Sequence, residues 1–335
     1  MKIKLGLAIT NENHAGVSNQ ALIKGILRQL SVARKYEFDG AFVGQHFLSW
    51  PIQTVQPIPL LGRMAAEAGH MNLGTGILLL PLFHPVEIAE QIATLDTITD
   101  GQFIFGSGLG YEEEEFEAFG VDRKFRAARF EESLQIIKDL WTKEYVNFNG
   151  KHFHLKNVRP TSRPVQKPYP KIWIAGNNHP AVRRAGRIGD AWLANPMSTV
   201  SGLEELLRSY RAGLADANKP NPEWLPLIRD VYLEKDREAA VKRCRPFIED
   251  RFKVYSSKGQ GEQGTPEDRL DVPFEQLIKD RFIIGNTNDF WKELDRYKTL
   301  GFNYFILEYR WIGMPDELAV DFVRLVGKEI LPSLS

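Results

Sequence analysis

One stretch, residues 71–117, constrains the fold of this chain more than any other. It reads MNLGTGILLLPLFHPVEIAEQIATLDTITDGQFIFGSGLGYEEEEFE, with two apolar runs that each lie beside glycines. Between the runs, Ile88, Ile92 and Leu95 recur at helical spacing and would fall on one side of a helix. The stretch therefore predicts a strand–helix–strand unit. Parallel α/β proteins place their binding sites at the carboxyl ends of such strands.

The same alternation continues along the chain. The candidate strands are short and apolar, as strands covered on both faces should be. They are Ile3–Ile9, Gly40–His46, Leu73–Leu80, Phe103–Gly106, Ile172–Ala175, Ala191–Ala194, Leu227–Leu233 and Tyr304–Glu308. Segments with helical periodicity separate them. Eight strands that alternate with helices predict an α/β fold, a (β/α)8 TIM barrel.

We expect residues 1–335 to form a single barrel domain with two insertions. The connections at about 111–170 and 235–286 are too long for simple turns. The first contains a predicted hairpin that turns at Asn149–Gly150. The second contains residues 256–271, SSKGQGEQGTPEDRLD, which are polar and rich in glycine. This composition predicts a mobile lid.

Composition argues against several classes of function. The 43 basic and 43 acidic residues balance, so nothing suggests nucleic acid or an anionic membrane as a partner. No segment approaches the roughly 20 apolar residues of a membrane helix. Cys244 is the single cysteine, which excludes an intramolecular disulfide and suits a cytoplasmic protein. No metal is expected, because no histidine or carboxylate spacing typical of a metal site is evident.

Small and polar residues at the predicted strand ends form the candidate site. Gly74–Gly76 and Gly106–Gly108 follow successive strands, where either tight packing or ligand approach would require small residues. Gly176–Asn178 precede a helix, where backbone N–H groups could bind phosphate or an asparagine could cap the helix. His46 could act as an acid or base, or could be structural. The acidic run Glu112–Glu115 is typical of a solvated helix start.

Longer motifs resemble the bacterial luciferase-like family of flavin-dependent monooxygenases. Four segments carry the resemblance, which covers nearly the whole chain: GTGILLLPLFHPVEIAEQIATLDTITDGQFIFGSGLGY, FGVDRKFRAARFEESLQIIKDLW, PKIWIAGNNHPAVRRAGRIGDAWLANP and GFNYFILEYRWIGMPDELAVDFVRLVGKEILPSL. The resemblance implies a barrel that binds FMN at the carboxyl ends of its strands. A separate reductase would supply the reduced FMN, which with O2 would oxidise a small organic substrate. Family members are often dimers, so a homodimer is expected.

Carried over by position, the resemblance assigns roles to individual residues. It implies a non-prolyl cis peptide at Gly76–Ile77, with the flavin ring against Thr75, Gly76 and Ile77. The other residues expected to contact the cofactor are Ser107, Gly108, Tyr111, Gly176, Asn177, Asn178, Ala194 and Asn195. Trp50 and Trp311 are expected on the substrate side.

Two departures from luciferase concern the chemistry. Luciferase has a histidine pair where this chain has Gln45 and His46, and the first histidine of that pair is its catalytic residue. Glutamine cannot act as a general base, so Gln45 cannot replace the catalytic histidine of luciferase in that role. Gln45 and His46 are the catalytic candidates at this position, and neither is assigned as the base. The arginine that luciferase offers to the flavin phosphate falls at Leu109. Arg126, from the following helix, could replace it.

Three other functions stay open at this point. A deazaflavin-dependent oxidoreductase of the same superfamily would share the barrel and much of the site, but would transfer hydride instead of activating oxygen. A non-catalytic flavin-binding protein would bind flavin without substrate-dependent oxygen consumption. A flavin-free barrel that binds a sugar phosphate is less favoured, because no clear catalytic lysine or carboxylate pair lies at the predicted strand ends.

Overall fold

A closed ring of eight parallel strands forms the centre of the protein in the computed structural model, which describes residues 2–257 and 268–334. Neighbouring strands pair in the order β11, β10, β7, β5, β3, β1, β14, β12. Their bounds are β1 Lys4–Ile9, β3 Gly40–Val43, β5 Asn72–Thr75, β7 Phe103–Gly108, β10 Lys171–Ala175, β11 Ala191–Leu193, β12 Pro226–Leu233 and β14 Tyr304–Glu308. A parallel bridge between Ala194 and Leu227 joins β11 to β12 and closes the ring. The predicted TIM barrel is confirmed.

The strands differ from the prediction at several places, among them β7, which continues to Gly108 instead of ending at Gly106. The predicted strand Leu73–Leu80 is interrupted after β5 by a cis peptide bond between Gly76 and Ile77, and it resumes as β6 (Leu78–Leu79). The expected cis peptide is therefore present. The second predicted strand ends earlier, at Val43, so His46 lies in the following loop. A short strand that was not predicted, β13 (Ile283–Gly285), pairs with the end of β12.

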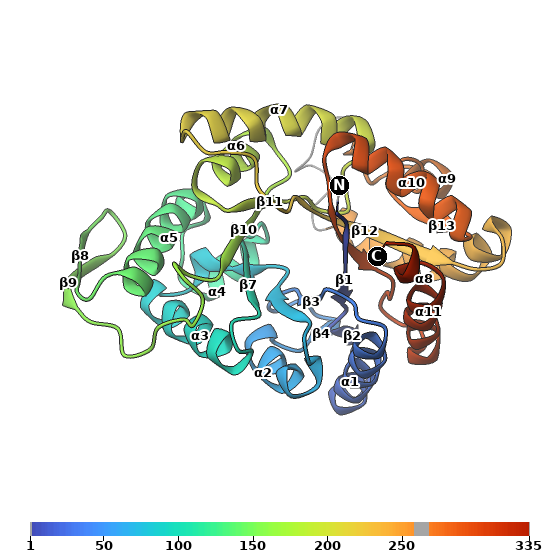
Figure 1. Cartoon of the computed structure of the whole chain (residues 1–335), viewed down its shortest axis with the longest axis horizontal. Helices are drawn as coiled ribbons and strands as arrows, with labels where there is room; N and C mark the ends of the chain where they lie inside the picture. The colour runs from blue at the N-terminus through green and yellow to red at the C-terminus, as the bar shows by residue number, and fades with distance from the viewer. Residues whose placement is uncertain (1, 258–267, 335) are drawn as a thin grey trace.

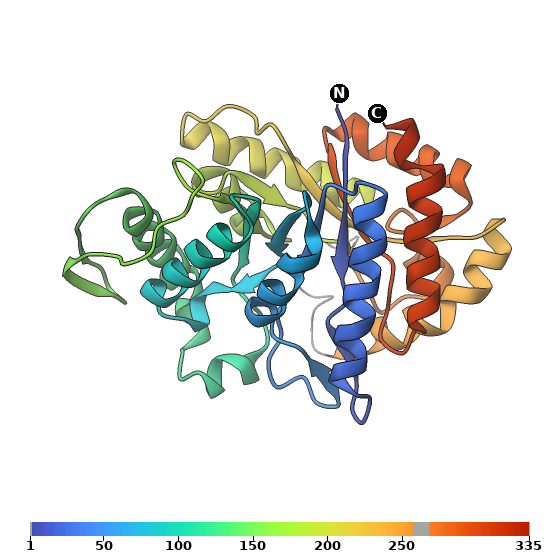
Figure 2. The ribbon, with the colours of Figure 1, turned by 60° about the horizontal axis from the view of Figure 1, so that its bottom comes forward.

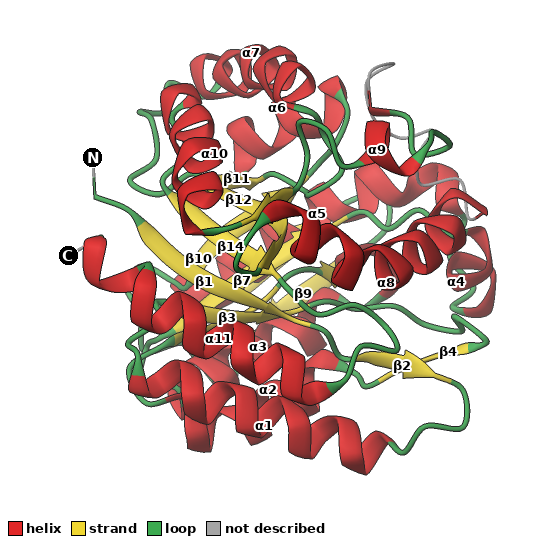
Figure 3. Ribbon diagram, turned by 90° about the vertical axis from the view of Figure 1, so that its right-hand side faces the viewer, coloured by secondary structure: helices red, strands yellow, loops and turns green. Residues whose placement is uncertain are grey.

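Helices surround the ring on the outside, as Figure 3 shows with α1, α2, α3 and α11 on one side and α6, α7 and α10 on the other. Their bounds are α1 Asn19–Lys35, α2 Pro57–Ala68, α3 Pro85–Ile98, α4 Glu113–Ala118, α5 Arg126–Thr142, α6 His179–Ile188, α7 Val200–Asp216, α8 Arg237–Ser257, α9 Phe274–Leu277, α10 Thr287–Leu300 and α11 Asp316–Glu329. The first and last long helices, α1 and α11, pack side by side, with both chain termini near the amino ends of the strands (Figure 2).

The core has two layers. Apolar stripes of the helices pack against the outer face of the sheet, and Ile88, Ile92 and Leu95 of α3 are all buried as predicted. Aromatic side chains fill the inside of the barrel, where the ring of Phe42 stacks on Trp173 with centroids 5.4 Å apart. Because this packing closes the lower part of the barrel, space for a ligand is left at the carboxyl ends of the strands.

The first insertion holds α4, α5 and the antiparallel hairpin of β8 (Val146–Asn149) and β9 (His154–Val158), which projects from the barrel in Figure 1. The predicted hairpin is confirmed. Asn149 pairs with His154, so the chain turns over the four residues 150–153, which begin at the expected Gly150. The carboxylate of Glu132 on α5 accepts hydrogen bonds from three successive N–H groups of that loop.

The second insertion holds α8, α9 and β13. Most of the predicted lid, residues 256–271, falls on 258–267, which lie outside the described residues. At the mouth of the barrel, β2 (Glu12–His14) and β4 (Ile52–Thr54) form a small antiparallel pair. Within the described parts of the chain, no helix is both long and apolar enough to cross a membrane.

Candidate cofactor-binding site

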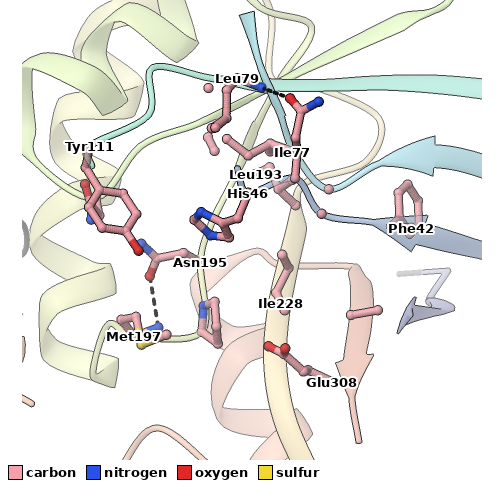
Figure 4. A pocket seen from close by; sticks show the side chains of 18 of the residues that line it. Phe42, His46, Ile77, Leu79, Tyr111, Leu193, Asn195, Met197, Ile228 and Glu308 are labelled. Atoms are coloured by element: carbon pink, nitrogen blue, oxygen red, sulfur yellow. Dashed lines mark hydrogen bonds between the residues drawn. The ribbon is translucent and has the colours of Figure 1, made fainter. Parts of the chain in front are cut away.

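A cavity of about 270 Å³ opens at the carboxyl ends of the barrel strands. Figure 4 shows side chains from several strands and their following loops that line it, including His46, Ile77, Asn195 and Glu308. The residues predicted from the sequence that line this cavity are Gln45, His46, Gly76, Ile77, Gly108, Tyr111, Gly176, Asn177, Asn178, Asn195 and Trp311. Residues from distant parts of the sequence are therefore brought to one place.

Four predicted residues do not line the cavity. The Thr75 hydroxyl is buried and donates to the Gly106 carbonyl at 2.6 Å, which ties β5 to β7. Ser107 is wholly buried, and its hydroxyl has no hydrogen-bond partner among the described residues. Ala194 closes the ring of strands. Trp50 lies outside the cavity with 79% of its surface exposed.

Part of the cavity lining is apolar and is built from opposite sides of the ring of strands. Phe42, Ile77, Leu193 and Ile228 contribute hydrophobic surface from four different strands or strand ends. A Cβ added at Gly76 would lie 3.0 Å from Cβ of Phe42, so the backbone there is already in close contact. A wall of this kind suits a flat, largely apolar ring system, and it was expected at this position.

The loop between β10 and α6 offers an anion site at another edge of the cavity. Gly176, Asn177 and Asn178 precede α6, whose start carries the positive end of the helix dipole. In its first turn Pro180 has no N–H group, and the Val182 N–H bonds to the Asn178 carbonyl at 2.9 Å. Asn178 also caps the helix, since its Oδ1 accepts from the Ala181 N–H at 3.1 Å. Both sequence interpretations of this loop, cap and phosphate loop, are therefore compatible with the structure.

Arg126 adds a cation to the cavity wall. Its Nη1 donates to the Arg123 carbonyl at 3.1 Å, while its Nε has no hydrogen-bond partner among the described residues. Burial, followed by the charge of the neighbouring Arg123, lowers the pKa of Arg126. A bound anion would offset this cost. An apolar ring wall, a helix start and an incompletely partnered arginine together fit a flavin with a terminal phosphate.

His46 is surrounded by acidic groups. Its Nδ1 lies 3.4 Å from Glu115 Oε1 and 3.5 Å from Glu112 Oε1, and its ring meets the Tyr111 ring edge-on. Burial alone would lower the pKa of His46, but the hydrogen bond to Glu115 and the charges of Glu12, Glu115 and Glu112 outweigh it. The pKa is raised overall, so His46 is suited to donating a proton or a hydrogen bond.

The side chain of Gln45 has a structural task. Its Oε1 accepts from the Leu79 N–H at 2.9 Å, and its Nε2 donates to Gln56 Oε1 at 3.2 Å. Gln56 in turn donates to the His46 carbonyl at 2.9 Å. This chain of amides holds β6, which follows Gly76–Ile77, in a fixed position relative to the loop that carries His46.

The acidic run Glu112–Glu115 at the start of α4 is less exposed to solvent than expected. The Glu115 side chain is 1% exposed and that of Glu112 is 10% exposed, so a fully solvated helix start is wrong for both. Glu115 accepts the Phe47 N–H at 2.8 Å in addition to its contact with His46. A buried carboxylate is retained there because it satisfies a backbone donor and an imidazole ring.

A buried charged cluster forms another part of the wall and was missed in the sequence. Asp230 on β12 accepts from Trp311 Nε1 at 2.7 Å and contacts Arg251 Nη1 at 3.1 Å. Arg251 also pairs with Glu308 at 2.6 Å. Burial and the charge of Glu308 raise the pKa of Asp230 to about 7, against the effect of Arg251. The sequence did contain a signal for this cluster, because Asp230 lies within an apolar strand and Glu308 lies at the end of another.

No group of three or more histidine, cysteine or acidic side chains could hold a metal ion in residues 2–257 and 268–334. The buried carboxylates of Glu115 and Asp230 are instead bonded to protein groups, Glu115 to the Phe47 N–H and Asp230 to Arg251. The side chains that line the cavity can bind and position a ligand and transfer protons.

Comparisons with known proteins agree on the family. A sequence model described as luciferase-like monooxygenase matches residues 3–304. An F420-dependent glucose-6-phosphate dehydrogenase from Nakamurella multipartita is 28% identical, over 92% of each chain. The oxygenase component of a flavin-dependent trigonelline monooxygenase from Acinetobacter baylyi is 24% identical, over 84% of this chain and 82% of that one.

A solved structure has the same fold as this chain. The crystal structure of monooxygenase RslO1 from Streptomyces bottropensis superposes with a TM-score of 0.86 at 22% identity, covering 99% of this chain and 100% of that one. At this level of identity the likeness concerns the fold.

Proposed function

Because this chain belongs to the luciferase-like monooxygenase family, we propose that it is the oxygenase of a two-component system. It takes reduced FMN from a separate flavin reductase and uses O2 to oxidise a small organic substrate. Relatives in the family include both flavin monooxygenase components and deazaflavin-dependent dehydrogenases, so the enzyme is a flavin or deazaflavin oxidoreductase. The choice of FMN within that class is our proposal.

The observation that carries this choice is the combination of an apolar wall with a compact anion site. FMN ends in a single phosphate, and Gly176–Asn178 at the start of α6 together with Arg126 offer backbone donors and one cation. The ring would be held against Gly76, Ile77 and Gly108. When bound, the reduced flavin supplies the electrons and the reactivity toward oxygen.

The residues of the chain then have three tasks. Apolar side chains such as Ile77, Leu193 and Ile228 exclude water from the space around the ring. Gln45 holds the strand segment next to the ring through its bond to the Leu79 N–H. His46, whose pKa is raised against the effect of burial by its hydrogen bond to Glu115 and by nearby carboxylates, donates a hydrogen bond or a proton to a group of negative charge that develops in the cavity.

A deazaflavin-dependent oxidoreductase is the second candidate, favoured by the relative that is 28% identical over 92% of the chain. It would use the same barrel and the same apolar wall, but transfer hydride to or from its substrate. The longer tail of a deazaflavin needs a path out of the anion site, whereas the phosphate of FMN ends there. The two candidates therefore differ in the preferred cofactor and in the use of oxygen.

Anaerobic titration of the purified protein with reduced FMN and with reduced coenzyme F420 tests both candidates. The monooxygenase predicts tighter binding of reduced FMN, and oxygen consumption that rises when a substrate is present. Preference for the deazaflavin would overturn the proposal in favour of the second candidate. Tight binding of FMN with oxygen consumption unaffected by any substrate would instead indicate a non-catalytic flavin-binding protein.

A further inference from the structure

The charges on the cavity wall do not balance once their partners are assigned. Its charged side chains are Glu12, His46, Arg126, Arg251, Glu308 and Arg310. Arg251 pairs with Glu308 at 2.6 Å, and His46 Nδ1 lies 3.4 Å from Glu115 Oε1. Arg126 and Arg310 form no ion pair with any described residue. One of these two cations is assigned to the cofactor phosphate in the proposed function, which leaves the other unexplained.

Arg310, which follows β14, is the better buried of the two, with 6% of its surface exposed. Its Nη1 makes one long hydrogen bond, 3.4 Å to the Thr10 carbonyl, and its Nε has no partner among the described residues. Asp316 is the carboxylate that acts most on the pKa of Arg310, but its oxygens are already bound by Arg28 and Gln29, at 2.6 Å and 2.5 Å.

An arginine in this state is costly for the folded protein. Burial lowers the pKa of Arg310, which means that its surroundings disfavour the charged form. Structural arginines in protein interiors are normally paired or fully hydrogen-bonded. A buried guanidinium that faces a cavity with donors to spare is instead typical of a site that receives an anion from outside.

The position of Arg310 separates it from the phosphate site. Arg126 begins α5, which follows β7, and Arg310 follows β14. In the ring of eight strands, β7 and β14 are four places apart and therefore lie on opposite sides of the mouth. A flavin whose phosphate reaches the side of Arg126 leaves Arg310 on the far side of the cavity, next to Trp311 and Ile312.

We propose that Arg310 binds a carboxylate carried by the substrate, so that the enzyme acts on small organic acids. This inference rests on the proposed function, because that function assigns Arg126 to the cofactor. A carboxylate matches the site better than a phosphate does. It brings a single negative charge to a single guanidinium, whereas a phosphate dianion needs several donors.

The test compares acids with their own amides, which keep the shape and lose the charge. Acetate, butyrate, hexanoate and benzoate, each beside its amide, are titrated calorimetrically into the protein with and without FMN. At least one acid should bind about ten- to hundredfold more tightly than its amide. Arg310→Gln should abolish that preference, and Arg324→Gln, at an exposed position on α11, should leave it unchanged.

The outcomes are distinct. If no acid binds more tightly than its amide, or if the preference persists in Arg310→Gln, the carboxylate site is wrong. If Arg310→Gln does not fold, Arg310→Lys is tested in its place, because it keeps the charge but loses the guanidinium group. If Arg310→Lys binds acids as tightly as the wild type does, the proposed carboxylate site is equally wrong. A protein that binds FMN but shows no acid preference refutes the carboxylate site alone. Acid preference without FMN binding refutes the proposed cofactor alone.

Discussion

Replacing Gly176 with alanine should weaken the binding of FMN and leave the binding of riboflavin nearly unchanged. Gly176 lies between β10 and α6, and its carbonyl is fixed by a 2.8 Å hydrogen bond from Trp192. An added Cβ would lie 2.9 Å from Cβ of Ala181, 3.0 Å from the Ala181 carbonyl carbon and 3.1 Å from the Val182 nitrogen. Two of these atoms belong to the backbone, so no side-chain rotation can relieve the contact.

The geometry sets the size of the effect. Carbon atoms pack at about 3.5–4.0 Å, so the loop and the first turn of α6 must separate by roughly 0.6 Å. A phosphate hydrogen bond of about 2.9 Å would then lengthen to about 3.5 Å, which ends its useful range. Loss of one such charge-assisted bond costs about 1.5–3 kcal/mol, or about ten- to hundredfold in the Kd of FMN. The overpacking itself should lower stability by about 1–3 kcal/mol.

Fluorescence titration with FMN and with riboflavin measures the two affinities, and thermal unfolding followed by circular dichroism measures stability. Gly62→Ala is the matched control, because a Cβ at this position in α2 meets nothing within 4 Å. Alanine there should stabilise the helix by about 0.5–1 kcal/mol and change neither affinity. An unchanged ratio of FMN to riboflavin affinity in Gly176→Ala would show that this loop does not hold the phosphate.

Three further predictions concern other parts of the cavity. Glu115→Gln should lower the pKa of His46. The stabilisation by the protonated ring is complete below the ordinary histidine pKa of about 6.5, and it is lost as pH rises through the raised pKa of the folded state. The decrease of Tm with rising pH should therefore occur at lower pH in the variant. An unchanged pH profile of Tm would contradict this prediction. Arg126→Gln should weaken FMN by about tenfold or more without affecting riboflavin in the same titration, and equal losses for both would count against a phosphate contact. Trp311→Phe removes the 2.7 Å hydrogen bond to buried Asp230 and should lower the unfolding free energy in urea by about 1–3 kcal/mol, whereas wild-type stability would refute it.

The barrel was predictable because its strands are short apolar runs that alternate with segments of helical periodicity. Residues 73–80 show where this signal fails, since the hydrophobic pattern continues across Gly76–Ile77 while the strand itself does not. Hydrophobicity reports burial, and the apolar residues on both sides of the interruption are buried, while Gly76 and Ile77 themselves are half-buried at the cavity. The three residues of β13 were missed for a different reason: a run this short has no period to recognise.

The site was predictable where small residues mark backbone that a ligand can approach, as at Gly76, Gly108 and Gly176. It was not predictable where function depends on the burial of a charge. Glu115 belongs to an acidic run that resembles a solvated helix start, and only the fold brings His46 and the Phe47 N–H to its carboxylate. The role of Arg310 was equally unpredictable from the sequence, because only the tertiary structure shows that it has no carboxylate partner among the described residues.

The way in which the barrel closes determines where its ring of strands can open locally. Between β11 and β12 the circle is completed by two hydrogen bonds, from the Ala194 N–H to the Pro226 carbonyl at 3.0 Å and from the Ile228 N–H to the Ala194 carbonyl at 2.9 Å. This seam holds the two strands far less firmly than the ladders on either side do. The backbone amides at this contact should exchange with deuterium earlier than those of β1 and β3. A bulky ligand could widen the mouth of the barrel between β11 and β12 while the other strands keep their register.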